Sequence, residues 1–134
     1  MIMNLVEVKE FSFAYPECSR KVLDHANLKI EEGTLNVICG RSGCGKSTLL
    51  RCLAGLESVD GGRILLDGED ITQKSAKSRN IGMVFQQYSL FPNMTAAENI
   101  AFGLTLQKRP GAEVRTLVAD AIEMVELGGK EDAL

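Results

Sequence analysis

The sequence predicts an α/β domain that begins with an antiparallel β portion. Three observations favour this class. Residues 4–15 and 28–37 are rich in β-branched and aromatic residues with partial alternation, a glycine-rich loop follows a short apolar run, and helical patterns follow later. With 134 residues, 45% of them hydrophobic and 25% charged, the chain can bury one core. We therefore expect one domain over residues 1–134.

A strand, a loop and a helix are expected next. The apolar run "TLNVIC", residues 34–39, predicts a short buried strand that leads into the glycine-rich loop. The segment 46–56 predicts a helix, because leucines recur there at i, i+4 and i+7: Leu49, Leu53 and Leu56. The order strand, loop, helix is typical of sites that bind phosphate groups.

A hairpin, another strand and two helices complete the pattern. Asp67-Gly68 between two apolar pieces predicts a tight β-hairpin, and "IGMVF", residues 81–85, predicts a further strand. Thr95 and Glu98 form a capping box for a helix near residues 96–104. One apolar stripe ended by two glycines predicts the last helix; its members are Val114, Leu117, Val118, Ala121, Ile122 and Val125.

The glycine-rich loop fits the pattern G-x-x-x-x-G-K-[ST] of the phosphate loop, also called the P-loop or Walker A motif. Its residues are Gly40, Arg41, Ser42, Gly43, Cys44, Gly45, Lys46, Ser47 and Thr48. Glycine allows backbone N–H groups to approach an anion closely, and the following helix adds its positive end. Lys46 is predicted to reach the β- and γ-phosphates, Ser47 to bind Mg²⁺, and Thr48 to add a second hydroxyl. The alternative is a plain glycine turn.

Asp67 has two interpretations. The run "ILLDGE" resembles an apolar strand whose terminal acid positions Mg²⁺. The run is short, however, and Asp-Gly between two apolar segments is typical of a tight turn, which favours the hairpin.

Composition excludes several classes of protein. A net charge of −3 with interspersed signs argues against a nucleic-acid partner. Four scattered cysteines and the single His25 give neither zinc-site spacing nor a disulfide framework, so we expect reduced thiols, most of them buried. Apolar runs are short and the amino terminus lacks a signal-peptide pattern, which predicts a cytosolic protein.

A longer stretch identifies a family. The segment "RNIGMVFQQYSLFPNMTAAENIAFGL", residues 79–104, together with "GRSGCGKSTLLRCLAGLE", resembles the ATP-binding subunits of ABC transporters over nearly the whole chain. The likeness is greatest to subunits of binding-protein-dependent importers, such as those for polyamines, iron, sulfate or sugars. It implies an α/β P-loop NTPase of ABC type with an N-terminal antiparallel β portion, here incomplete.

The resemblance also implies roles for particular residues. Tyr15 corresponds to the aromatic residue that stacks on adenine, although an ordinary strand tyrosine is the alternative. Gln86 corresponds to the Q-loop glutamine that contacts Mg²⁺ and the attacking water; "VFQ" favours it over Gln87. The implied cofactors are ATP and Mg²⁺. The implied partners are a membrane permease, a second nucleotide-binding domain and, indirectly, a solute-binding protein, at the inner face of the cell membrane.

Further family motifs do not occur in this sequence. It has no LSGGQ-like signature, no apolar strand ending in Asp-Glu, no D-loop and no switch histidine. We expect an N-terminal fragment whose parent protein is the ATPase, and we expect the 134-residue chain alone not to hydrolyse ATP. Two alternatives remain: an ABC ATPase of translation or DNA repair, and a nucleotide-binding module without turnover.

Overall fold

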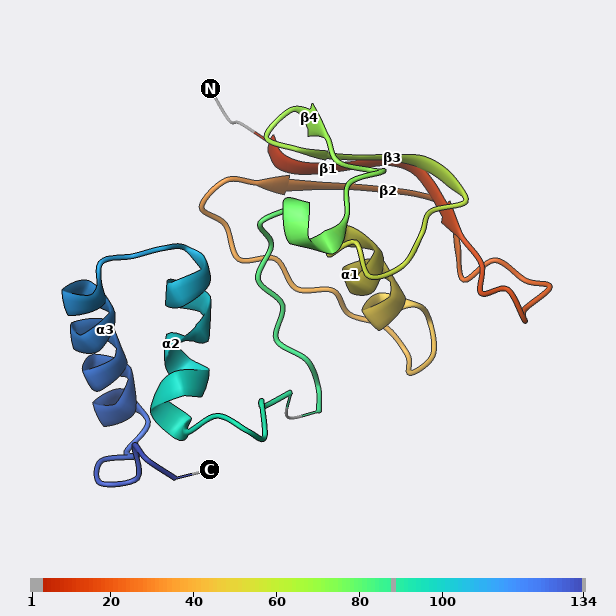
Figure 1. Ribbon diagram of the computed structural model, residues 1–134. Helices are drawn as coiled ribbons and strands as arrows, with labels where there is room; N and C mark the ends of the chain where they lie inside the picture. The colour runs from red at the N-terminus through yellow and green to blue at the C-terminus, as the bar shows by residue number, and fades with distance from the viewer. Residues whose placement is uncertain (1–3, 88, 134) are drawn as a thin grey trace. The chain divides into compact units, whose positions relative to one another are not determined.

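The computed structural model describes residues 4–87 and 89–133 (Figure 1). These residues form two compact units, with the boundary between Val84 and Phe85. The first unit contains a β-sheet, helix α1 and the short 3₁₀ helix η1 (Ala76–Ser78), and the second contains helices α2 and α3. Among the described helices, none combines the length and the apolar character that crossing a bilayer requires.

An antiparallel sheet dominates the first unit. Its strands, in the order β2-β1-β3-β4, are β1 (Asn4–Phe13), β2 (Leu23–Glu31), β3 (Gly61–Leu66) and β4 (Glu69–Asp70). Strand β1 pairs with both β2 and β3, so Val8 lies opposite Leu28 on one side and Ile64 on the other. The expected antiparallel β portion is confirmed, and with α1 so is the α/β class.

The core of the first unit joins this sheet to helix α1 (Lys46–Leu53). The register between β1 and β2 shifts between Val8 and Phe11, as at a β-bulge. A bulge changes which residues of a strand share a face of the sheet. Both residues are consequently buried in one cluster, whose members are Val8, Phe11, Phe13, Cys52, Ile64 and Ile71. Each large side chain buried there contributes about 1.5–3 kcal/mol, and together they hold α1 against the sheet.

The Asp67-Gly68 hairpin is confirmed. Asp67 has φ +49° and Gly68 has φ +77°, and positive φ at both central residues is the requirement of a type I′ turn. The turn connects β3 to β4, and the Asp67 N–H donates to the carbonyl of Leu5 at 2.7 Å. Asp67 therefore belongs to a hairpin, as the Asp-Gly pattern favoured.

Two predicted strands are absent from the described residues. Residues 34–39 and 81–85 have no regular secondary structure, and β2 ends at Glu31 instead of continuing to residue 37. Leu35 is 94% exposed, so residues 34–39 are not the predicted buried strand; Val84, in the second segment, is 98% exposed. Apolar composition alone does not form a strand, because each strand needs a neighbour to complete its backbone hydrogen bonds. No such pairing occurs here in the described part of the chain.

The cysteines also differ from expectation. Cys18, Cys39 and Cys44 are exposed and only Cys52 is buried; all four are free thiols. Cys18, Cys39 and Cys44 lie on loops. Because loops run along the protein surface, their side chains are accessible to solvent even when they are apolar.

The second unit is a helical hairpin made of α2 (Ala96–Leu106) and α3 (Gly111–Met124). The predicted capping box of α2 is present, and the predicted stripe of α3 buries Val118 and Ile122, although Leu117 and Val125 are exposed. After α3 the chain returns to the amino end of α2, where the Ala97 N–H donates to the Glu131 carbonyl at 3.0 Å.

Candidate phosphate-binding site

The phosphate loop, residues 40–48, owes its shape to its glycines. Gly43 and Gly45 have φ of +77° and +97°, a region that residues with a Cβ rarely adopt. A Cβ at Gly45 would lie 3.0 Å from Cγ1 of Val22, and a Cβ at Gly40 would lie 2.7 Å from Sγ of Cys44. The loop is thus a cradle that other residues would fill or distort.

The amino end of α1 is left open by this loop. Its N-cap residue is Gly45, no side chain caps the helix, and no acidic residue stands in the first turn. The first N–H groups of a helix have no intrahelical partner, and they carry the positive end of the helix dipole. An anion is the natural ligand of such an end.

Lys46 adds a full positive charge. Its Nζ donates to the carbonyl oxygens of Gly40 at 2.9 Å and Arg41 at 2.8 Å, and it lies 3.7 Å from Sγ of Cys44. No ion pair joins Lys46 to a carboxylate of the described residues. Neutral acceptors hold the ammonium group inside the loop, so its charge is not compensated locally.

Tyr15 is attached to the helix that follows the loop. Its hydroxyl is 3.1 Å from Oγ1 of Thr48, and its ring makes an edge contact with Phe13 at a centroid distance of 4.9 Å. Thr48 is only 7% exposed, so its hydroxyl positions Tyr15 instead of facing the solvent. The structure brings these two predicted site residues together, and Thr48 directly follows Lys46 and Ser47 in the sequence.

The remaining predicted residues are exposed. Arg41, Ser42 and Ser47 lie on the surface of the loop and the first turn of α1. Gln86 is exposed too, in a bend without regular secondary structure that belongs to the second unit. The described residues contain no group of three or more His, Cys, Asp or Glu side chains that could hold a metal.

Comparison with known proteins identifies the family. The family model described as ABC transporter matches residues 23–134, most of the chain. This chain belongs to the ABC transporter family.

Two ABC relatives and one solved structure illustrate the likeness. The Fe(3+) ions import ATP-binding protein FbpC of Photorhabdus laumondii is 46% identical over 129 residues, which are 96% of this chain and 36% of the relative. The spermidine/putrescine import ATP-binding protein PotA of Haemophilus influenzae is 48% identical over 123 residues, 92% of this chain and 32% of the relative. The ATP-binding cassette MJ0796, solved as a post-hydrolysis dimer with ADP and Pi, has a TM-score of 0.80 at 31% identity and covers 95% of this chain and 60% of that one. The chain thus spans about a third of the length of these two relatives.

Sequence reasoning missed how this ABC-family chain closes the other end of α1. Arg79 is 3% exposed and donates at 2.8–3.0 Å to four backbone carbonyls, those of Cys52, Leu53, Thr72 and Lys74. Burial lowers the pKa of the Arg79 guanidinium. Because every acceptor is a main-chain carbonyl, no pattern of side chains in the sequence could have revealed these contacts.

Gly55 completes that closure. It has φ +78°, its N–H donates to the Cys52 carbonyl at 3.1 Å, and the N–H of Leu56 donates to the Arg51 carbonyl at 2.9 Å. These two bonds form a Schellman motif, which satisfies the last carbonyls of a helix. In this ABC domain, α1 is therefore closed at its carboxyl end and open only toward the phosphate loop.

Proposed function

We propose that this chain is the nucleotide-binding part of an ATP-binding subunit of an ABC transporter, whose whole protein couples ATP binding and hydrolysis to solute import. The observation that carries the proposal is the open amino end of α1, together with the Lys46 ammonium, which only carbonyl oxygens of the loop hold and which has no carboxylate partner among the described residues. The importer class is supported by two relatives, which are named for the import of iron and of spermidine or putrescine.

Different groups of the site would contact different parts of the nucleotide. Backbone N–H groups of residues 40–48 bind phosphate oxygens, and Lys46 turns from its two carbonyl acceptors toward the β- and γ-phosphates. Tyr15, fixed through Thr48, offers its ring to the adenine.

Ser47 would hold Mg²⁺ together with phosphate oxygens and water, and contact of Gln86 with the ion stays what the family resemblance implies. A hydroxyl and an amide oxygen suit this ion, because Mg²⁺ at nucleotide sites keeps several waters and takes few protein ligands. When bound, Mg²⁺ would neutralise part of the negative charge of the phosphate groups.

The partners of the whole protein are proposed from the family. They are a membrane permease, a second nucleotide-binding domain and, indirectly, a solute-binding protein. The subunit would lie in the cytoplasm, at the inner face of the membrane, against the permease. The 134-residue chain would bind nucleotide without turnover, because its sequence holds neither the signature nor the acid that polarises the attacking water.

Lys46→Ala tests the phosphate assignment. Charge-assisted hydrogen bonds contribute about 1.5–3 kcal/mol, so a fluorescent ATP analogue should bind at least about tenfold more weakly. Lys77→Ala is the matched control, because Lys77 is exposed and lies on η1, outside the loop. Equal affinity of the Lys46→Ala and control variants would refute the assignment.

A further inference from the structure

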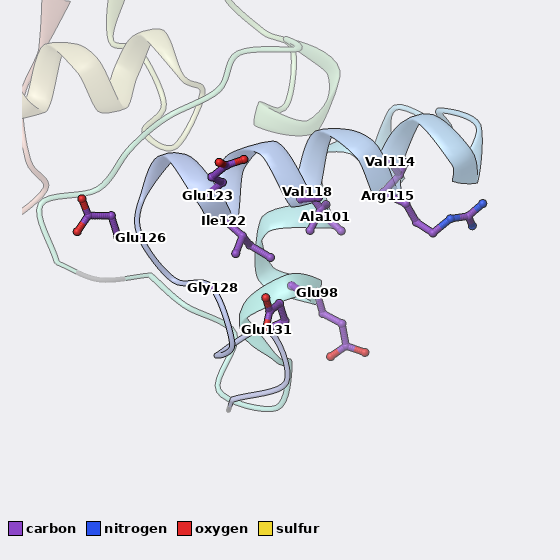
Figure 2. Close-up of a pocket in the computed structure, with 12 residues that line it drawn as sticks. Glu98, Ala101, Val114, Arg115, Val118, Ile122, Glu123, Glu126, Gly128 and Glu131 are labelled. Carbon is purple, nitrogen blue, oxygen red and sulfur yellow. The ribbon is translucent and has the colours of Figure 1, made fainter.

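A thiol and an ammonium group meet inside the phosphate loop. Besides its two bonds to loop carbonyls, Nζ of Lys46 donates to Sγ of Cys44 at 3.7 Å. Among the described residues, no other cysteine sulfur accepts a hydrogen bond from a lysine. The cavity between α2 and α3 in the second unit offers no comparable pair, since neither cysteine nor lysine is among the residues that line it (Figure 2). A nucleophilic sulfur beside an amine is therefore a distinct feature of the loop.

A small molecule can reach both groups from the solvent. Cys44 is exposed and Lys46 is only partly buried. Gly40 contacts both of them, because its carbonyl accepts a Lys46 bond and the Cys44 sulfur lies 2.7 Å from where a Cβ on Gly40 would be. The loop backbone thus holds sulfur and nitrogen close together. Because the lysine stem is flexible, rotation about its bonds can bring Nζ onto the sulfur.

We propose that hydrogen peroxide converts this pair into a covalent bridge, a sulfenamide between Sγ of Cys44 and Nζ of Lys46, and that the bridge reversibly closes the phosphate loop to nucleotide. Formation of the bridge depends only on the two side chains. Its effect on nucleotide rests on the proposed function.

The bridge forms in two steps. The thiolate of Cys44 attacks one oxygen of hydrogen peroxide, the O–O bond breaks, and a sulfenic acid forms while the second oxygen leaves with the thiol proton as water. After its ammonium proton has passed to the solvent, Nζ of Lys46 attacks the sulfur; the N–S bond forms, the S–O bond breaks, and the hydroxyl leaves with a proton from nitrogen as water. One thiol, one amine and one peroxide give one sulfenamide and two waters.

The bridge removes what the loop offers to phosphate. The nitrogen of a sulfenamide is uncharged, so the loop loses the positive charge of Lys46, and the side chain is tied to the sulfur. A thiol reductant attacks the same sulfur and releases the amine as a mixed disulfide forms, and a second thiol frees Cys44. Bound nucleotide draws Lys46 to its phosphates and should therefore slow formation of the bridge.

Peptide mapping by mass spectrometry tests the bridge itself. The full chain carries Cys18→Ala and Cys39→Ala, so that these exposed thiols form no disulfide with Cys44. After treatment with hydrogen peroxide, trypsin should leave residues 42–51 uncut at Lys46, as one peptide that is lighter by two hydrogen atoms than its reduced form. Oxidation of Cys44 to sulfinic or sulfonic acid, with normal cleavage after Lys46, would overturn the proposal.

Removing the amine should stop the reaction at its first step. In Lys46→Gln, Cys44 should remain a sulfenic acid that dimedone labels, and the light peptide should be absent. Lys77→Gln is the matched control, because Lys77 is exposed on η1 and should not change the product. If the parent chain and Lys46→Gln take up dimedone to the same extent, Lys46 does not capture the sulfenic acid and the proposal is wrong.

Binding of the fluorescent ATP analogue tests the consequence. Peroxide should weaken binding by the parent chain at least about tenfold, as the loss of a charged donor does, and dithiothreitol should restore it. The affinity of Cys44→Ser, compared before and after peroxide, should not change. If Lys46→Ala and the parent bind equally before oxidation, the proposed nucleotide site fails, whereas mapping still decides the bridge. If Lys46→Ala weakens binding but the light peptide never forms, the nucleotide site stands and the bridge is refuted.

Discussion

Helices α1 and α2 begin in opposite ways. At α2, Oγ1 of Thr95 accepts the N–H of Glu98 at 3.2 Å, and the Glu98 carboxylate accepts the N–H of Thr95 at 2.8 Å. At α1, the N-cap is Gly45, which has no side chain to offer, and the first turn contains no acid. Side chains satisfy first-turn donors of α2, whereas α1 has no side-chain cap. This difference in capping is what the proposed phosphate site at α1 rests on.

The two ends of α1 differ as well. Its carboxyl end receives both a Schellman motif at Gly55 and the buried guanidinium of Arg79. A glycine N-cap costs about a few tenths of a kcal/mol relative to Ser, Thr, Asp or Asn. The contacts at the other end offset that cost, so that α1 stays folded while its donors remain available.

Arg79→Ala should have the largest effect on stability. It removes the donor that the carbonyls of Leu53, Thr72 and Lys74 have in the structure, whereas the Cys52 carbonyl keeps the Gly55 N–H. Unsatisfied buried groups cost about 1–3 kcal/mol each, so the free energy of unfolding should fall by about 3 kcal/mol or more. Urea denaturation followed by circular dichroism measures this. Arg63→Ala, at an exposed position, is the control and should stay within about 0.5 kcal/mol of the parent. A loss below about 1 kcal/mol for Arg79→Ala would mean that water replaces the guanidinium.

Local signals in the sequence were sufficient for much of this structure. The Asp67-Gly68 hairpin, the Thr95 capping box and the glycines of the phosphate loop each depend on residues close together in the chain, and the structure contains all three. The features that the sequence did not predict correctly depend on contacts between residues far apart in the chain. Residues 34–39 and 81–85 have strand composition but no described neighbour to pair with, and Arg79 binds carbonyls up to 27 residues away.

Roles are harder to predict than geometry. The sequence placed Tyr15 and Thr48 at one site, and the structure joins their hydroxyls. Stacking of Tyr15 on adenine and binding of Mg²⁺ by Gln86 stay predictions, because each role concerns a ligand and not a contact within the chain.

Stability at high pH should depend on Cys52. Burial, and secondarily the Glu57 carboxylate, raises the pKa of this thiol from 9.0 to about 11. As pH rises, the unfolded chain loses the proton first, so the free energy of unfolding is unaffected below about pH 9 and falls by about 2–3 kcal/mol toward pH 11. Comparing urea denaturation at pH 8 and pH 10.5 for the parent and Cys52→Ala isolates this contribution. The exposed Cys18→Ala serves as control, and an equal pH dependence of parent and Cys52→Ala would contradict the prediction.

Thr95→Ala removes the capping box that distinguishes α2 from α1. The expected loss is about 1 kcal/mol, seen as faster hydrogen exchange of the first amides of α2, with the affinity for the ATP analogue unchanged. Thr105→Ala is a matched control in the same helix, since Thr105 donates only to the Ala101 carbonyl, within the helix. If both variants have the same effect, the cap contributes nothing.

Ser47→Asp gives α1 the kind of acid that α2 already has. An acidic side chain in the first turn interacts favourably with the helix dipole, so the free energy of unfolding should rise by about 0.3–1 kcal/mol. The same carboxylate would repel phosphate oxygens from the N–H groups that it faces, so the ATP analogue should bind at least about tenfold more weakly. Ser47→Ala removes the hydroxyl without adding charge, and comparing the two variants separates loss of a ligand from repulsion. Gain of stability with loss of binding is the signature of a helix end kept open for an anion. If Ser47→Asp binds the analogue as well as Ser47→Ala does, the phosphates do not lie at this end of α1, and the contrast with α2 has no functional meaning.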